Sequence, residues 1–408
     1  MSNTPKIRFS GFTEDWGQRK LGDISSLITK GTTPKDKSGN GDVNFIKVEN
    51  INDFSGDIVG MSKISLEEHQ GYLKRSQLQE GDILFSIAGT LGRVTSVNKA
   101  ILPANTNQAL SIIRLKEGNL EYVKTCLKGN VVADFIRRNP TIGAQPNLSL
   151  EQVSNLEIEI PSEAEQEKIG ACFQSLDHLI TLHQRKYDDT KLLKKYMLQK
   201  MFPQNGQKVP EIRFSEFTGD WEQRKLGEVF EQTSNLVNPK EDEIELWSLT
   251  VEDGLTKKSD RYNREFLVKK DDNFKEVRPG DIVYNPMNMT LGAVGYNGMA
   301  KSVAVSGYYT TMVTKENYDT YYINTWLKSP QAIQLYRTYA TGSLIEKQRV
   351  QFPTLSIIPV AFPKYEEQTK IGSYFDSLDN LITLHQRKCD ELQELKKYML
   401  QNMFPQKG

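Results

Sequence analysis

The 408-residue sequence contains none of the patterns that most often carry catalysis. It has no G-x-x-x-x-G-K-[ST] loop for nucleotide phosphates and no H-E-x-x-H helix for a catalytic zinc ion. It also lacks the G-x-S-x-G turn that exposes a nucleophilic serine. We therefore predict a non-catalytic chain that binds no metal ion or other cofactor of its own. The four histidines do not recur at a metal-ligand spacing: His69, His178, His183 and His385.

One fragment begins like part of a methyltransferase site. Asn285-Pro286-Met287-Asn288 starts as does the N-P-P-[YFW] loop with which adenine methyltransferases grip a flipped base. Met287 replaces the second proline and Asn288 replaces the aromatic residue, so no ring is present to stack on a base. We interpret this stretch as an ordinary loop.

Side chains suited to reading base edges occur in two sets. Arginine and lysine pair with guanine, and asparagine and glutamine pair with adenine, through parallel hydrogen bonds in the major groove. Any one of them is more often a solvated side chain or a turn cap, but two such sets favour nucleic-acid binding. The first set is Lys30, Thr32, Thr33, Lys35, Lys47, Arg93, Asn105, Asn107, Gln108, Gln145 and Asn147. The second set is Asn285, Asn288, Thr290, Arg337, Lys347, Gln348 and Arg349.

Two nearly identical stretches must organise these loops. Residues 161–204 and 363–406, aligned at an offset of 202, are identical at 30 of 44 positions. Each begins at a proline and contains no other proline until Pro203 or Pro405, which favours one continuous helix. Such a helix would have about 38 residues and a length of about 57 Å. Ser162 and Glu165 have the spacing of a capping box at its start.

Apolar residues recur along each predicted helix at alternating steps of four and three, the heptad pattern of a coiled coil. One long helix cannot bury this seam alone, so we expect the two copies to pair lengthwise. Histidines stand at equivalent seam positions, with Tyr187 or Cys389 one turn later, and we interpret them as determinants of register rather than as metal ligands. The predicted seam consists of Ile169, Phe173, Leu176, Ile180 and His183 in the first helix and of Ile371, Phe375, Leu378, Ile382 and His385 in the second.

A second repeat precedes each helix. The stretch from residue 7 to 22 returns at 212 to 227, and both copies contain I-R-F-S, F-T and W-x-Q-R-K-L-G. The chain is therefore a tandem of two units. The predicted parts are a variable domain at 1–160, a long helix at 161–204, a second variable domain at 205–362 and a second long helix at 363–408.

The variable domains share only a few short sequence segments. G-D-I occurs at Gly81 and Gly280, and T-L-G occurs at Thr90 and Thr290, with the glycines expected in tight turns. Different loops on a shared frame are typical of binding specificity. Neutral drift after duplication is the alternative explanation, but it does not explain why the helices stayed so alike.

Short β-type runs and helical stretches alternate in both domains, so we predict an α+β fold in which two mixed α/β domains share one architecture. The predicted strands cover 82–87, 111–115, 281–284 and 302–305, the helices cover 120–139 and 318–339, and the closing strands cover 156–161 and 357–363.

The overall composition is that of an ordinary protein without membrane spans. Lysine plus arginine and aspartate plus glutamate number 52 each, and this zero net charge lowers the expectation of DNA binding unless the charges are segregated by face. No run of about eighteen apolar residues and no signal peptide is evident, which predicts a cytoplasmic protein. The three cysteines lack C-x-x-C spacing, which argues against both a disulfide framework and a zinc site.

The order of these parts resembles the DNA-specificity subunit of Type I restriction-modification systems. The likeness covers essentially the whole chain, although the second unit lacks a clear G-x-T-P turn and the N-L-S run. It is carried by the two W-x-Q-R-K-L-G openers, the Gly31-x-Thr33-Pro34 turn, the two G-D-I segments, the Asn147-Leu148-Ser149 run and the E-Q-x-K-I-G helix starts at Glu165 and Glu367.

The resemblance implies that each variable domain is a target recognition domain reading one half of a bipartite double-stranded DNA sequence. It implies that the long helices pack antiparallel as a coiled-coil spacer, with an approximate internal twofold, and fix the separation of the half-sites. Two modification subunits would dock on the helices and methylate adenine N6 with S-adenosylmethionine. Two restriction subunits, which use ATP and Mg, would join them, so these cofactors are expected in the partners.

An alternative from a different class stays open at this point: a coiled-coil adaptor that binds only proteins and grips peptides with its variable domains. Salt-dependent binding to duplex DNA separates the two, because phosphate neutralisation makes affinity fall steeply with salt. A stand-alone methyltransferase or nuclease would need a catalytic constellation that the sequence lacks.

Overall fold

The computed structural model describes residues 4–53, 55–129, 131–132, 135, 147–204, 206–252, 254–257, 273–342 and 348–405. The chain divides into two compact units. Unit 1 comprises Met1–Arg185 and His385–Gly408, and unit 2 comprises Lys186–Leu384. Each unit therefore contains one variable domain and one part of each long helix.

The two long helices form as predicted. Helix α5 spans Glu163–Lys200 and helix α10 spans Tyr365–Asn402, with 38 residues each. Each follows a closing strand and ends just before Pro203 or Pro405, because proline lacks the N–H group that would continue the helix. The predicted length of about 38 residues is confirmed.

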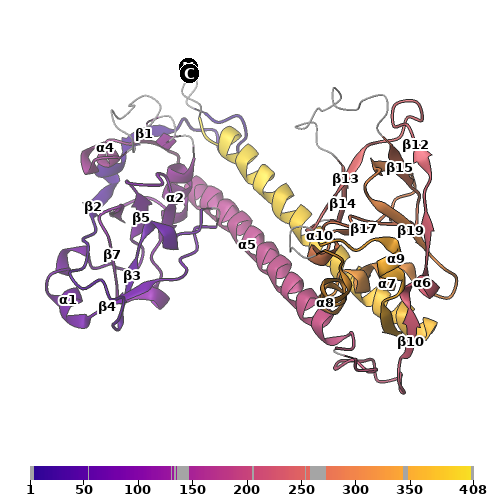
Figure 1. Cartoon of the computed structure of the whole chain (residues 1–408). Helices are drawn as coiled ribbons and strands as arrows, with labels where there is room; N and C mark the ends of the chain where they lie inside the picture. The colour runs from indigo at the N-terminus through magenta and orange to yellow at the C-terminus, as the bar shows by residue number, and fades with distance from the viewer. Residues whose placement is uncertain are drawn as a thin grey trace. The chain divides into compact units, whose positions relative to one another are not determined.

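In unit 1, four antiparallel strands form the central sheet, in the order β2-β8-β5-β6. Beside it lies a three-stranded sheet, β4-β3-β7, in which β3 and β7 run parallel (Figure 1). The strands are β2 Ser25–Lys30, β3 Val43–Ile46, β4 Ser62–Ile64, β5 Ile83–Ser86, β6 Val94–Ser96, β7 Ala104–Thr106 and β8 Leu110–Leu115.

Unit 2 repeats the central sheet with strands β11-β19-β16-β17 in the same antiparallel arrangement. A three-stranded sheet, β12-β15-β18, and a β13-β14 pair complete it. The strands are β11 Phe230–Thr233, β12 Leu236–Val237, β13 Trp247–Thr250, β14 Gly254–Lys257, β15 Phe274–Val277, β16 Ile282–Tyr284, β17 Val294–Tyr296, β18 Val303–Ser306 and β19 Thr310–Thr314.

The repeated opener of each unit pairs with its closing strand. Strand β1, Gly17–Lys20, runs antiparallel to β9, Glu157–Ile160, and β10, Glu222–Lys225, runs antiparallel to β20, Pro359–Phe362. The predicted closing strands are thus confirmed, and the two ends of each variable domain meet. The shorter helices are α1 Leu66–Gln70, α2 Leu120–Lys128, α4 Leu150–Ser154, α6 Leu226–Val229, α7 Thr320–Leu327, α8 Pro330–Tyr339 and α9 Phe352–Ser356, with 3-10 turns at Leu21–Ile24, Val48–Asn50, Lys74–Ser76, Lys99–Ile101 and Met289–Leu291.

The prediction of one helix over 318–339 is wrong, because α7 and α8 are separate helices. Ser329 caps α8 by accepting a hydrogen bond from Ala332 N at 3.2 Å, and Pro330 occupies the first helical turn, where proline is tolerated. The helix predicted over 120–139 begins at Leu120 and α2 ends at Lys128, while much of the remainder lies outside the described residues.

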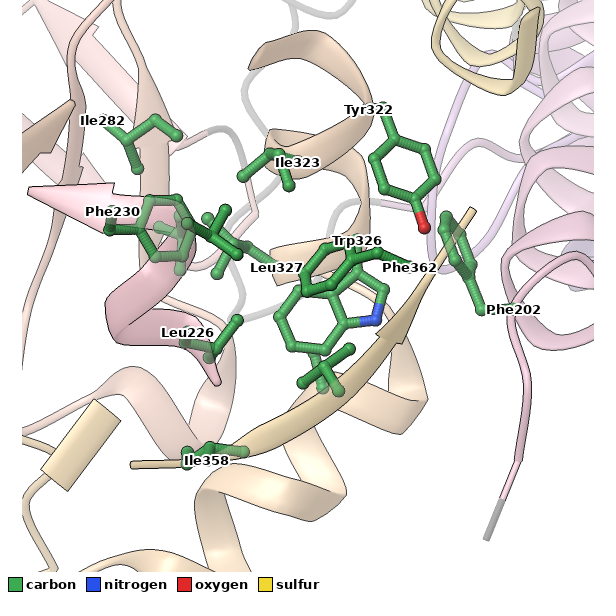
Figure 2. Packing of buried hydrophobic residues seen from close by; sticks show 14 of the residues in the cluster. Phe202, Leu226, Phe230, Ile282, Tyr322, Ile323, Trp326, Leu327, Ile358 and Phe362 are labelled. Carbon is green, nitrogen blue, oxygen red and sulfur yellow. The ribbon is translucent and has the colours of Figure 1, made fainter. Parts of the chain in front are cut away.

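The core of unit 2 joins the variable domain to both long helices (Figure 2). Trp221 of the opener, Tyr322 of α7 and Phe362 of β20 pack together. Phe202, just after α5, stacks on Phe375 of α10 with ring centroids 5.9 Å apart. The end of one helix and the beginning of the other therefore lie side by side within this unit.

Unit 1 repeats this core with equivalent residues. Trp16, Tyr122 and Phe173 surround Phe404, whose ring centroid lies 5.9 to 6.2 Å from each of theirs. Phe404 and Phe202 are equivalent at the offset of 202, and so are Phe173 and Phe375. The antiparallel packing implied by the resemblance is thus present inside each unit.

The predicted seam is only partly a helix-to-helix seam. Ile169 and Leu176 pack into the core of unit 1, and Ile371 and Leu378 pack into the core of unit 2. Because the helices are antiparallel, each of these residues lies beside the far end of the other helix. It does not lie beside the equivalent residue of the other repeat. The remaining seam residues are Ile180, which is buried, Ile382, which is half-buried, and the contacting pair His183 and His385.

Within the described ranges, no helix is long and apolar enough to cross a membrane. Across these same residues, no group of three or more His, Cys, Asp and Glu side chains is arranged to hold a metal ion.

Candidate nucleic-acid interface

One end of the central sheet in unit 1 gathers much of the first candidate set. Strand β2 ends at Lys30, and the next two backbone N–H groups donate to carbonyl oxygens around the β7–β8 connection, at 3.2 and 2.9 Å. Thr33 Oγ1 then donates to Gln108 Oε1 in that connection. The G-x-T-P turn is therefore held against the segment that carries Asn107 and Gln108.

The neighbouring sheet delivers two more candidates to the same end. Strands β3 and β7 run parallel, with Ile46 opposite Thr106, so Lys47 and Asn107 leave their strands side by side. Asn147 is exposed and forms a bridge with Ala88 in the β5–β6 connection. We call this set strand-end surface 1: Lys30, Thr32, Thr33, Lys47, Asn107, Gln108 and Asn147.

Lys35 lies next to strand-end surface 1, two residues beyond Thr33. Its ammonium group is 4.6 Å from the centroid of the Tyr72 ring, a cation–π distance. Its backbone N–H donates to Glu68 Oε1 at 2.7 Å, which fixes the chain after the turn.

The corresponding end of the sheet in unit 2 gathers the second set. Asn285 follows β16 at the point where Tyr284 faces Thr310 of β19. Val350 N donates to Pro286 O at 2.9 Å, which brings the chain after Arg349 against the β16–β17 connection. We call the set strand-end surface 2: Asn285, Asn288, Gln348, Arg349 and Tyr308, of which Tyr308 was not predicted.

Two candidates of the first set make hydrogen bonds inside the domain and so stabilise its loops. Asn105 is fully buried, and its amide donates to Leu73 O and Ser76 Oγ at 2.9 and 3.1 Å. Arg93 donates to two backbone carbonyl oxygens of the 48–51 segment at 3.0 and 2.9 Å. We leave both out of strand-end surface 1, because their polar groups already have partners inside the domain.

Thr290 and Arg337 form a similar internal contact in unit 2. Thr290 is buried, and its carbonyl oxygen accepts a hydrogen bond from Arg337 Nε at 3.3 Å. The contact ties α8 to the β16–β17 connection. The two remaining candidates, Gln145 and Lys347, lie outside the described residues.

The repeated G-D-I segments are structural, as the turn interpretation predicted. Gly81 and Gly280 have φ values of 84° and 89°, which favour glycine. The buried carboxylate of Asp82 accepts two hydrogen bonds from Arg114, at 2.7 and 2.8 Å. Asp281 accepts one from Arg278 N, and burial raises the pKa of its carboxyl group. These turns start the strands that end at the two surfaces.

A buried ion pair joins each opener to its long helix. Arg8 donates to both carboxylate oxygens of Glu165 at 2.7 and 2.8 Å, and Arg213 makes the same bonds to Glu367, both at 2.7 Å. Hydrogen bonding to Glu165 is the largest cause that raises the pKa of Arg8. The capping-box interpretation of Glu165 is therefore wrong, because a distant arginine engages both of its oxygens.

The rest of the E-Q-x-K-I-G run packs α2 of the variable domain against the long helix α5. Gln166 accepts a hydrogen bond from Asn119 N at 3.0 Å and donates to Pro161 O at 2.9 Å. A Cβ on Gly170 would lie 2.7 Å from Asn119 Oδ1, so only glycine allows α2 to approach this closely. Unit 2 repeats the arrangement with Asp319, Gln368 and Gly372. Each variable domain is thus packed closely on a long helix through α2 or α7.

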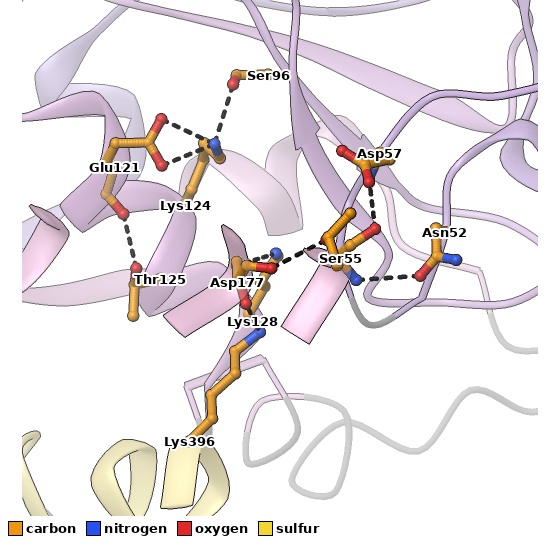
Figure 3. A network of polar contacts seen from close by, with 11 residues as sticks. Asn52, Ser55, Asp57, Ser96, Glu121, Lys124, Thr125, Lys128, Asp177 and Lys396 are labelled. Atoms are coloured by element: carbon orange, nitrogen blue, oxygen red, sulfur yellow. Dashed lines mark hydrogen bonds and ion pairs between the residues drawn. The ribbon is translucent and has the colours of Figure 1, made fainter. Parts of the chain in front are cut away.

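A charged cluster strengthens this joint in unit 1 (Figure 3). Asp177 of α5 accepts a hydrogen bond from Lys128, at the end of α2, and forms an ion pair with Lys396 of α10. Burial, followed by the nearby Lys128 charge, lowers the pKa of Lys396. In unit 2 the equivalent pair is Lys194 with Asp379. Tyr321 of α7 also donates to Asp379, at 2.9 Å, so one domain helix and both long helices meet at each carboxylate.

Two variable domains of one architecture, each exposing a different set of loop residues at the same end of its central sheet, have the layout of a two-site recognition protein. The chain matches the family model for the Type I restriction modification DNA specificity domain twice, at residues 13–191 and 218–394. It belongs to this family, and so is a specificity subunit, the non-catalytic DNA-recognition component of a Type I restriction-modification system.

Known proteins resemble the chain, some of them along nearly its full length. It is 22% identical over 438 residues to the putative type I restriction enzyme MjaX specificity subunit of Methanocaldococcus jannaschii, covering 98% of this chain and 95% of that protein. It is 29% identical over 167 residues to the type I restriction enzyme EcoBI specificity subunit of Escherichia coli, covering 38% of this chain and 34% of that protein. The crystal structure of the Type-I restriction-modification S subunit from M. genitalium has the same fold, with a TM-score of 0.67, 13% identity and coverage of 99% and 100% of the two chains.

Proposed function

We propose that each strand-end surface binds one half of a bipartite double-stranded DNA target. The observation that supports this most directly is that residues differing between the repeats collect at corresponding ends of corresponding sheets. The parts shared by the repeats, in contrast, form turns, cores and joints. A protein that reads two different half-sites needs this division between scaffold and reading surface.

The two surfaces contain side chains suited to phosphate contacts and side chains suited to base contacts. Lys30, Lys47 and Arg349 supply positive charge for phosphates, which positions the protein without reading sequence. Asn147 and Gln108 in unit 1, and Asn285, Asn288 and Gln348 in unit 2, supply the amide groups that pair with adenine through two hydrogen bonds.

The partner proteins bind the long helices. Large apolar side chains remain exposed there, with 37% to 55% of each exposed. They recur at the offset of 202, so each unit presents the same set, which fits two copies of one partner. The set in unit 1 is Leu179, Leu182, Leu395 and Tyr398, and the set in unit 2 is Leu381, Leu384, Leu193 and Tyr196.

The partners on the helices are two modification subunits, which transfer a methyl group from S-adenosylmethionine to adenine. Two restriction subunits, which use ATP and Mg, join this assembly. The cofactors bind to the partners, and the assembly works in the cytoplasm. The comparisons favour DNA recognition over the protein-only adaptor.

Mapping methylated adenines in cells that carry this chain with its modification partner tests the proposal. The expected result is methylation confined to one bipartite sequence with a fixed gap. The purified complex should bind that sequence with an affinity that falls steeply with salt, because phosphate contacts release counterions. Methylation without any shared sequence would contradict the proposal.

A further inference from the structure

Tyr308 has the most exposed large apolar side chain of the described residues, with 87% of its surface accessible. It lies in the connection between β18 and β19, which corresponds to the connection of unit 1 that carries Asn107 and Gln108. The ring therefore stands in strand-end surface 2, at a place where unit 1 presents amide groups.

The turn that carries the ring is tightly held. Tyr309 N donates to Ser306 O at 3.0 Å, and Gly307 N donates to Asn273 O at 2.9 Å. A Cβ at Gly307 would lie 2.3 Å from Asn273 O, so the turn lies directly against the neighbouring chain. Lys275 Nζ also donates to Tyr309 O at 2.8 Å. The ring is thus presented by an ordered backbone, which lowers the entropic cost of a contact made through it.

Other exposed apolar side chains belong to the neighbouring connection. Met287 and Leu291 are 50% and 55% exposed in the segment between β16 and β17. Because Tyr284 faces Thr310, the chain leading to Met287 leaves the sheet beside the turn that carries Tyr308. Exposed apolar side chains grouped in this way mark interaction sites.

We propose that Tyr308, together with Met287, makes an apolar contact with thymine methyl groups in the major groove of the second half-site, and so sets specificity there. This inference rests on the proposed function and adds the residue and the chemistry. The thymine methyl group is the apolar feature of a base edge, and aromatic side chains pack against it. The first half-site, facing Gln108 and Asn107, is read through hydrogen bonds.

The test uses the full chain in complex with its modification partner and a duplex carrying the mapped target. Each thymine of the second half-site is replaced in turn by deoxyuridine, which lacks only the methyl group. Removing a contacted methyl should weaken binding about four-fold, the effect of exposing one such group. At that position, Tyr308→Ala should bind thymine and deoxyuridine equally well.

Two further variants make the result specific. Tyr308→Phe keeps the ring and should keep the preference for thymine, whereas a contact made by the hydroxyl group would lose it. Gln108→Ala should keep the preference in the second half-site, because Gln108 faces the first.

Several outcomes would overturn the inference: no effect of deoxyuridine at any position, a second half-site without thymine, or an undiminished preference in Tyr308→Ala. These differ from a failure of the proposed function, in which the wild-type complex would show no sequence preference at all.

Discussion

His183 Nδ1 lies 3.0 Å from His385 Nδ1, and the two residues occupy equivalent positions in the two long helices. Antiparallel helices bring repeat equivalents together only at one crossing level. Away from it, the beginning of each helix faces the end of the other. The same ion pair therefore forms twice, as Lys396 with Asp177 in unit 1 and as Lys194 with Asp379 in unit 2.

Phe404→Ala should destabilise the first variable domain, although the substitution lies at the end of the second helix. Phe404 packs against Trp16 and Tyr122, so its loss should cost about 3 kcal/mol of unfolding free energy. Hydrogen exchange should speed up in α2 and leave α7 unchanged.

Phe202→Ala is the matched variant and should reverse the pattern, with faster exchange in α7, because Phe202 packs against Tyr322. Equal acceleration in both domains from either substitution would argue against the reciprocal packing.

Asp177→Asn should give a stability deficit that depends on pH. The substitution removes the counter-charge of two largely buried lysines, which should cost about 3 kcal/mol at neutral pH. Burial already lowers the pKa of Lys396 from 10.5, and the loss of Asp177 should lower it further. The unfolded chain then binds more protons than the folded chain, so the deficit should shrink as pH rises toward about 10.

Urea unfolding between neutral and alkaline pH measures this effect. Asp390→Asn, at an exposed position of α10, is the control and should change stability little at any pH. A deficit in Asp177→Asn that is constant or grows with pH would be inconsistent with the charge cluster.

Gly170→Ala should destabilise unit 1 even though alanine favours helices by about 1 kcal/mol over glycine. The added Cβ would lie 2.7 Å from Asn119 Oδ1 and 2.9 Å from Tyr122 N, so α2 would have to shift away. We expect a lower melting temperature and weaker DNA binding. Gly17→Ala, where the added Cβ meets only an ordinary 3.8 Å contact, should be nearly neutral. A stabilised Gly170→Ala variant would refute the tight docking of α2.

Leu182→Glu should reduce the number of bound modification subunits from two to one. Leu182 and its equivalent Leu384 are 37% and 41% exposed, so neither substitution should disturb the cores. Native mass spectrometry of the assembled complex counts the copies, and Leu182→Glu with Leu384→Glu should leave none. Two bound copies in the double variant would rule out these apolar sets as docking sites.

The helices were predictable from sequence because their pattern is long, periodic and free of proline. The ion pair between Arg8 and Glu165 was not predictable. Glu165 has the spacing of a local helix cap, and only the fold brings Arg8 to it. The recurrence of both residues in both units was the signal that could have revealed the pair.

The two strand-end surfaces were predictable in part. Residue type singled out Gln108 and Asn147, which are exposed, but equally Asn105, which is fully buried. Burial depends on strand pairing between distant segments, which residue type does not report. Tyr308 was not predicted, because its exposure depends on a turn that only the structure defines.

The central claim is that each variable domain reads its own half of one DNA target. The most direct measurement exchanges residues 1–160 for the corresponding domain of another specificity subunit and maps methylated adenines in cells with the modification partner. We expect a new sequence in one half-site, with the other half-site and the gap between them unchanged. A change in both half-sites, or in neither, would contradict it.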